Sequence, residues 1–96
     1  MNAPAVTFGR MVRGTGTEAG TSVMDVLANG ERVGVIEAEM VDANERSSTR
    51  AKRWTVTGYT LILWTPDAES LHPVAADGPR AALARAKAAA VRLVTA

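Results

Sequence analysis

The chain of 96 residues contains no cysteine, a single histidine and only four aromatic residues. Without cysteine it cannot form a disulfide framework, a thiolate zinc site or a thiol nucleophile. No apolar run approaches the roughly 20 residues that span a membrane, and the N-terminus lacks the basic and apolar regions of a signal peptide. These absences exclude a disulfide-stapled secreted scaffold, and we expect a soluble, cytoplasmic protein without membrane association.

Large apolar side chains are also scarce. Alanine supplies 18 of the 45 hydrophobic residues, which leaves 27 larger side chains to build a core. A domain of this size is stable only when nearly all of these side chains are used, or when a partner covers the remainder. We expect residues 1–21 to be an N-terminal segment, with a short strand over residues 5–12 followed by a flexible Gly/Thr loop, and residues 22–96 to be a single ββ-β-α domain.

The clearest local signal is Asn29-Gly30 between two apolar, β-branched segments. Both residue types accept the positive φ angles of a type I′ turn, so the sequence predicts a hairpin with Ala28 opposite Glu31. In a regular ladder Leu27 then faces Arg32, and further pairs follow by counting: Val26 with Val33, Met24 with Val35, and Val23 with Ile36. The second strand is expected to continue to Val41.

Residues 54–65 are rich in β-branched and aromatic types and predict the strongest strand, with Gly58 as a candidate bulge. Pro66 ends it, and residues 67–78 have the composition of a turn-rich connection. Asp77 or Gly78 can cap a helix and Pro79 suits its first turn, so we expect a helix over residues 80–94. Its apolar stripe consists mostly of alanine, which lets the helix approach a sheet closely but buries little area.

These elements predict an α+β fold: an antiparallel sheet of three or four strands, with one C-terminal helix packed on one face. Because the predicted strands carry large apolar side chains on both faces, one helix leaves the second face uncovered. The cover could be the N-terminal segment, a second copy of the chain or a different protein. The alternative is that sheet twist and the segment 66–76 suffice.

Candidate catalytic chemistry is sparse. His72 lies near Asp67, Glu69 and Ser70, but a lone imidazole in a proline-bounded segment is usually solvated, and no nucleophile elbow or oxyanion pocket accompanies Ser70. Glu37 and Glu39 have the spacing of an ordinary solvated strand face. We therefore expect no enzyme activity, no catalytic or metal site and no cofactor.

Charge alternates in sign along the chain. Residues 1–45 carry a net charge of −4, residues 46–66 of +4, residues 67–78 of −3 and residues 79–96 of +4. The basic segment 46–53, with cations Arg46, Arg50, Lys52 and Arg53, also holds hydroxyl side chains and leads into Trp54. This composition suits phosphate contacts, although it is also that of a solvated loop whose cations offset an acidic strand.

Two resemblances carry expectations. The three predicted strands and the helix, with Trp54-Thr55-Val56 as a W-x-V on the third strand, resemble the arm-binding domains of tyrosine recombinases, which lay a three-stranded sheet in the DNA major groove. Those domains carry basic and aromatic groups on the exposed sheet face, whereas this sheet offers Glu37, Glu39 and aliphatic residues. The small size, the hairpin and the Ala-Leu-x-x-Ala-Lys tail are also similar to uncharacterised accessory proteins of high-GC phages and prophages.

The sequence thus predicts a non-enzymatic accessory protein of phage or mobile-element type. We expect it to bind a protein partner or itself through a sheet face or edge, with Trp54, Tyr59 and Trp64 as partner-binding anchors. The alternative is a nucleic-acid-binding module that uses Arg46, Arg50, Lys52 and Arg53 together with the C-terminal helix.

Overall fold

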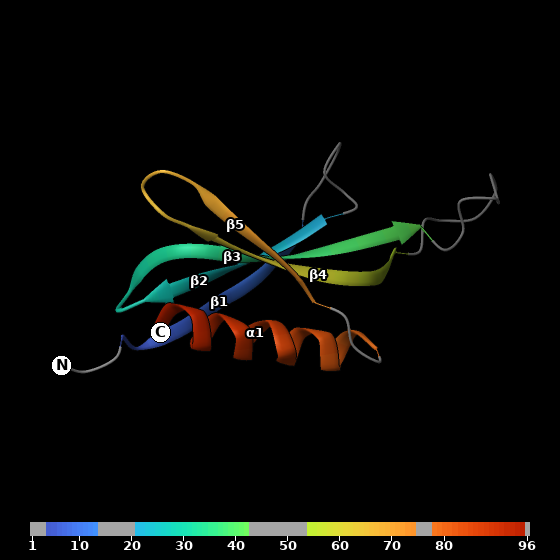
Figure 1. The fold of residues 1–96 in the computed structure, drawn as a ribbon. Helices are drawn as coiled ribbons and strands as arrows, with labels where there is room; N and C mark the ends of the chain where they lie inside the picture. The colour runs from blue at the N-terminus through green and yellow to red at the C-terminus, as the bar shows by residue number, and fades with distance from the viewer. Residues whose placement is uncertain (1–3, 14–20, 43–53, 75–77, 96) are drawn as a thin grey trace.

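The fold is a five-stranded antiparallel sheet with one helix on one side (Figure 1). It is seen in a computed structural model that describes residues 4–13, 21–42, 54–74 and 78–95. The elements are β1 (Val6–Arg13), β2 (Thr21–Ala28), β3 (Glu31–Asp42), β4 (Trp54–Trp64), β5 (Glu69–Val74) and α1 (Pro79–Thr95). The strands pair in sequence order, so β3 lies at the centre and β1 and β5 form the edges. The predicted α+β class and antiparallel sheet are confirmed.

The number of strands differs from the prediction of three or four. The segment expected to be a connection contains β5, which pairs with β4 and makes β4 an interior strand. A tight turn joins the two, in which the Thr65 amide and hydroxyl both donate to the Ala68 carbonyl, at 2.7 and 2.9 Å. Pro73 made this segment look unlike a strand in the sequence. Because β5 is an edge strand, the missing N–H of Pro73 removes no hydrogen bond between strands.

The predicted hairpin turn is confirmed. Asn29 and Gly30 have φ angles of 52° and 83°, and Ala28 pairs with Glu31. The Asn29 side chain also accepts a hydrogen bond from the Ala5 amide at 2.9 Å, while the Asn29 amide donates to the Ala5 carbonyl. The turn therefore also holds the start of β1, which extends the sheet beside β2 and does not cover its second face.

The predicted register holds for Leu27 with Arg32 and is wrong beyond that pair. A bulge follows, so Val26 pairs with Gly34, Met24 with Ile36 and Val23 with Glu37. Local patterns do not show where an extra residue enters a ladder, and Gly34, which follows the bulge, approaches β4 so closely that a Cβ there would collide with the Ile62 carbonyl oxygen. A second shift, in β1 between Phe8 and Met11, places Met11 beside the core in place of Val12. A third shift falls beside Gly58, as the sequence indicated.

The core lies between the sheet and α1. Its largest fully buried side chains are Val26, Ile36 and Leu61, one from each of the three interior strands. Opposite them Ala82, Ala86 and Ala90 form the buried stripe of the helix, which packs mainly over β4 and also reaches both edge strands. Gly78 caps the helix, since its carbonyl accepts the Ala82 amide at 3.1 Å, and Pro79 opens the first turn.

Candidate interaction surface

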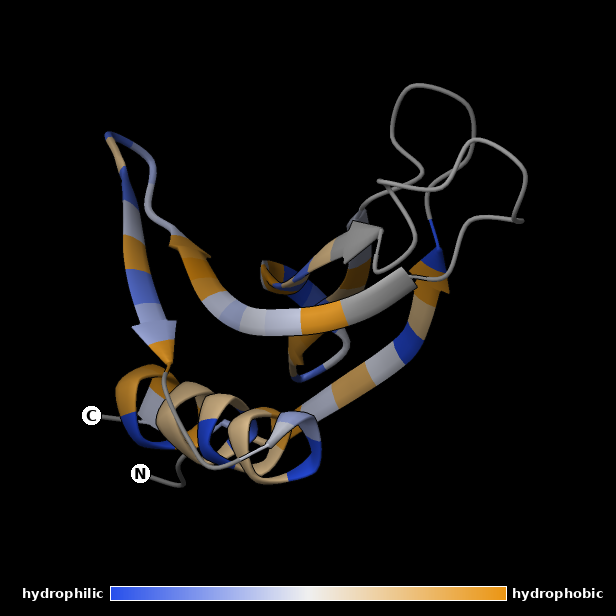
Figure 2. Cartoon of the chain, turned by 90° about the vertical axis from the view of Figure 1, so that its right-hand side faces the viewer, coloured by the Kyte–Doolittle hydropathy of each residue, from blue (hydrophilic) through white to orange (hydrophobic). Residues whose placement is uncertain are grey.

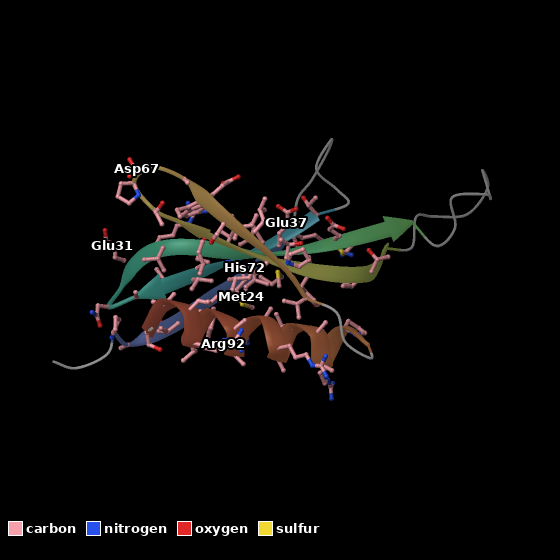
Figure 3. All side chains as sticks on the ribbon, viewed as in Figure 1. Met24, Glu31, Glu37, Asp67, His72 and Arg92 are labelled. Atoms are coloured by element: carbon pink, nitrogen blue, oxygen red, sulfur yellow. The ribbon has the colours of Figure 1, made fainter. Side chains whose placement is uncertain are left out.

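The sheet has one face that no described element covers. In Figure 2 the helix is seen nearly end-on and lies on one side of the sheet only. Figure 3 shows the same division at side-chain level: Met24 points toward α1, whereas Glu37 lies on the opposite side. We call this opposite side the open face. Its residues follow from the strand register and are Thr7, Val12, Thr21, Val23, Asp25, Leu27, Arg32, Val35, Glu37, Glu39, Thr60, Ile62, Trp64, Glu69, Leu71 and Pro73.

The centre and margins of the open face are apolar. Val35, Ile62 and Leu71 lie side by side across β3, β4 and β5, and Val12 pairs with Val23 at the far edge. Leu71 is 58% exposed, Val12 61% and Trp64 38%, so three large apolar side chains of this face are open to solvent. Val35 itself is only 6% exposed, and Asp25 and Glu37 separate the two apolar areas. Exposed large apolar side chains among polar groups are typical of a protein-interaction surface.

A polar cluster crosses one end of this face. The Arg32 guanidinium donates from Nε to Asp25 Oδ1 at 2.8 Å, and its Cζ lies 4.8 Å from the ring centroid of Trp64. Arg32 therefore spans from β2 to β4 across the central strand. Both partners of the ion pair are about half exposed, so the pair adds little stability, about 0–1 kcal/mol. Together the two contacts place the guanidinium between the Asp25 carboxylate and the Trp64 ring.

The other end of the face is acidic. Glu37 pairs with Val23 and Thr60 in the row beyond Val35, and Glu39 follows one row further, next to Gly58. Within the described ranges, neither carboxylate has a basic side chain at ion-pair distance. The face thus has one end with the Arg32–Asp25 ion pair and Glu69 beside Trp64, a middle row in which Asp25 precedes Val35, Ile62 and Leu71, and an anionic end at Glu37 and Glu39.

The predicted partner-binding aromatics are divided by the structure. Trp64 lies on the open face. Tyr59 points the other way and is 8% exposed in the core beside α1, so its ring is not accessible to a partner. The side chain of Trp54 lies outside what the structure describes. Leu71 and Val12 were not among the predicted anchors, because their exposure depends on β5 and on the bulge in β1, which no local pattern showed.

The predicted nucleic-acid residues Arg46, Arg50, Lys52 and Arg53 lie outside the described residues. The cations of α1 are described: Arg80, Arg85 and Arg92 are exposed on the outside of the helix. Lys87 lies with its ammonium 5.5 Å from the ring centroid of Phe8. The helix contains no acidic residue, so all of its charged side chains are basic, and they share its outer surface with exposed Val91 and Leu93.

Both edges of the sheet are poorly suited to pairing with another strand. β5 has six residues and includes Pro73, which has no amide hydrogen to donate. β1 is interrupted by its register shift between Phe8 and Met11 and carries exposed Arg10 and Arg13. Short strands, proline, bulges and cations are the features by which natural sheets block edge pairing. The geometry therefore favours the face over the edge as the binding surface.

A pocket of about 400 Å³ lies on the helix side, between the last turn of α1 and the β4–β5 hairpin. Its lining includes Leu63, Leu93 and Val94, together with Ser70 and His72, whose Oγ and Nε2 atoms are 3.0 Å apart. Acyl transfer through such a pair needs a carboxylate to orient the imidazole and donors for an oxyanion. Neither a carboxylate nor a second ionisable side chain is among the lining residues.

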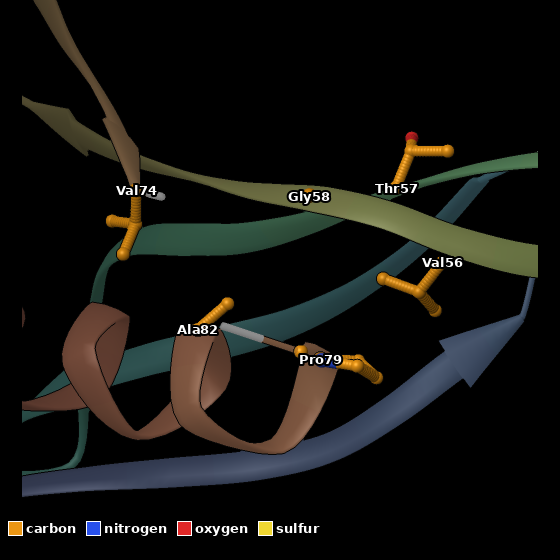
Figure 4. A pocket seen from close by; sticks show the side chains of 7 residues that line it. Val56, Thr57, Gly58, Val74, Pro79 and Ala82 are labelled. Atoms are coloured by element: carbon orange, nitrogen blue, oxygen red, sulfur yellow. The ribbon is translucent and has the colours of Figure 1, made fainter. Parts of the chain in front are cut away.

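A second pocket, of about 370 Å³, lies where the N-terminal end of α1 approaches β4 and β5 (Figure 4). Val56, Val74 and Ala82 surround it, and Thr57 points away from the helix. None of its seven lining residues is ionisable. Across the described ranges, no three His, Asp or Glu residues gather in a way that could hold a metal ion. These cavities therefore offer no constellation for catalysis.

Comparison with known protein families, with curated proteins and with solved structures finds no match for this chain. Among the described residues, no helix has the length and apolar character needed to cross a membrane.

Proposed function

We propose that the protein is a non-enzymatic accessory protein, of the phage or mobile-element type that its sequence resembles, and that it binds a protein through the open face. The observation that carries this proposal is the exposure of Val12, Trp64 and Leu71 on a sheet face whose other side already holds the helix. Val91 and Leu93 of α1 are also exposed, so the open face holds three of the five exposed large apolar side chains among the described residues. In a chain with so few large apolar side chains, leaving them in water is costly unless a partner covers them.

Because the sheet edges are unsuited to pairing, a partner is expected to dock on the face. Trp64 is the side chain on this face best suited to anchor it. Tryptophan and arginine dominate the energetic centres of protein interfaces, and here the two are stacked on each other before any partner arrives. A side chain already held in place loses less conformational entropy on binding.

Site-specific photo-crosslinking in the native host tests this proposal. A photoreactive residue at Leu71 is expected to give a discrete protein adduct, whereas the same residue at Ala84, exposed on the outer side of α1, is not. The Leu71 adduct is expected to disappear when Val12, on the same face, is changed to arginine. Equal labelling at the two positions, or no adduct at Leu71, would contradict the proposal.

A second candidate function is nucleic-acid binding, and the exposed cations of α1, with no acidic residue in the helix, favour it. Phosphate-driven binding weakens steeply with added salt, because each neutralised phosphate releases counterions. A salt-titrated mobility-shift assay with Arg80→Gln and Arg92→Gln tests it: each substitution should reduce the salt slope by about 1. A salt-independent shift, or none, excludes this candidate.

A further inference from the structure

We propose that the partner on the open face is a second copy of this chain, stacked face to face about a two-fold axis that runs across the strands above Val35. This inference rests on the proposed use of the open face and names its occupant.

The size of the face suits a stable dimer. Five strands about 4.8 Å apart, with eight residues rising about 3.3 Å each, give a flat area of about 600 Å². Side chains make the accessible area of such a face larger than its flat area. A specific interface buries roughly 800 Å² on each partner, so the open face alone is close to that requirement.

The order of charges along β3 determines how two copies fit. On β2, the residues Leu27, Asp25 and Val23 are evenly spaced, and they pair with Arg32, Val35 and Glu37 of β3. The bulge thus makes Arg32 and Glu37 the two neighbours of Val35 on the open face, at about equal distances on either side. The central strand therefore presents cation, apolar residue and anion in a line.

Two copies of this row of β3 side chains match in charge only when the two strands run in opposite directions. With the two-fold axis running across the strands above Val35, the two β3 strands cross antiparallel, and Arg32 lies over the partner's Glu37 at both ends. With the axis along the strands, the β3 strands run parallel, and Glu37, which has no cation at ion-pair distance within the described ranges, lies over the partner's Glu37. Like charges facing each other across an interface cost several kcal/mol, so the charges select the antiparallel dimer.

The apolar row lies along the same axis. In the antiparallel dimer Ile62 and Leu71 stack on the partner's Ile62 and the partner's Leu71, which covers the side chain that is 58% exposed in the single chain. Asp25 also lies on this row and faces the partner's Asp25. Each of these carboxylates is paired with Arg32 of its own chain at 2.8 Å, so Arg32 is shared between Asp25 and the partner's Glu37. Two sheets stacked in this way form a sandwich with a helix on each outer side.

Sedimentation equilibrium of the purified full chain tests the arrangement. The wild-type chain is expected to form a dimer, and Arg32→Glu and Glu37→Arg are each expected to raise the dimer dissociation constant roughly tenfold or more. An equimolar mixture of the two variants is expected to restore the dimer, because the carboxylate introduced at position 32 of one chain then faces the guanidinium introduced at position 37 of the other. Circular dichroism of each variant checks that the fold is kept.

A wild-type chain that stays monomeric overturns this inference, and so does a mixture that associates no better than either variant alone. A monomer that still gives the specific Leu71 adduct with a different protein overturns only the second copy as occupant. If the wild-type chain forms no dimer and Leu71 gives no adduct, both the second copy as occupant and the open face as a binding surface are overturned.

Discussion

At the scale of single residues, glycine at position 34 determines how the central strands meet. A Cβ built there would collide with the Ile62 carbonyl oxygen and lie 2.9 Å from Leu63 Cδ2. Backbone atoms of a paired strand cannot move aside without breaking the ladder. The absence of a side chain therefore lets β3 and β4 approach, directly after the bulge that places Arg32 next to Val35 on the open face.

Gly34→Ala is expected to destabilise the fold by about 2 kcal/mol or more, since the clash is with backbone. Gly58→Ala is the matched control, because a Cβ at that position meets no atom within 4 Å. The control should change stability by less than about 1 kcal/mol. Urea unfolding followed by circular dichroism gives both values, and equal losses for the two substitutions would show that close approach is not what Gly34 provides.

At the scale of elements, α1 packs on the sheet through alanine side chains. The charge in its first turn opposes the helix dipole. Ala82, Ala86 and Ala90 are at most 4% exposed, so the helix axis lies close to the sheet. Its first turn contains no acidic residue and includes Arg80, whereas its last turn carries Arg92. A cation opposes the helix dipole at the N-terminus and complements it at the C-terminus.

Reversing these two charges should therefore have opposite effects. Arg80→Glu is expected to stabilise the protein by about 0.3–1 kcal/mol, and Arg92→Glu to destabilise it by a similar amount. Both side chains are exposed, so neither change disturbs packing. Thermal unfolding at low and high salt measures the difference, which should shrink as salt is added. Shifts of the same sign for both variants would rule out the dipole as their cause.

At the scale of the whole molecule, the fold has a thin core on one side of the sheet and an exposed apolar face on the other. Among the residues that the structure describes, only three large side chains are fully buried, and all three lie between the sheet and the helix. Comparable apolar side chains, such as Leu71, remain in solvent. The stability of the single chain therefore depends mainly on the helix side, although Val35 is buried on the open face, and we assign association to the open face.

Two leucines on adjacent strands separate these roles. Leu61 is fully buried and Leu71 is 58% exposed. Leu61→Ala should cost about 2–5 kcal/mol of unfolding free energy, whereas Leu71→Ala should cost less than about 0.5 kcal/mol at low protein concentration. Leu71→Ala should instead weaken self-association. Chemical denaturation and sedimentation of both variants measure this, and a large loss of monomer stability from Leu71→Ala would place Leu71 in the core.

Sequence patterns were reliable where a feature depends on neighbouring residues. Asn29-Gly30 specified its turn through positive φ angles, Gly78-Pro79 marked the start of the helix, and the β-branched run from Trp54 formed a strand. The turn of β5 also had a local signal in Pro66-Asp67, a common turn dipeptide. Pro73 concealed that strand, because the sequence does not show which strand will lie at an edge.

The sequence by itself determined the turns, the class of fold and the excess of apolar strand surface over what one alanine-lined helix covers. Tertiary structure alone decided the register, the side to which Tyr59 and Trp64 point, and the order Arg32, Val35, Glu37 along the open face. Local backbone preferences are set by each residue and its neighbours. Register and facing instead depend on contacts between distant strands, such as the fit of Gly34 against Ile62.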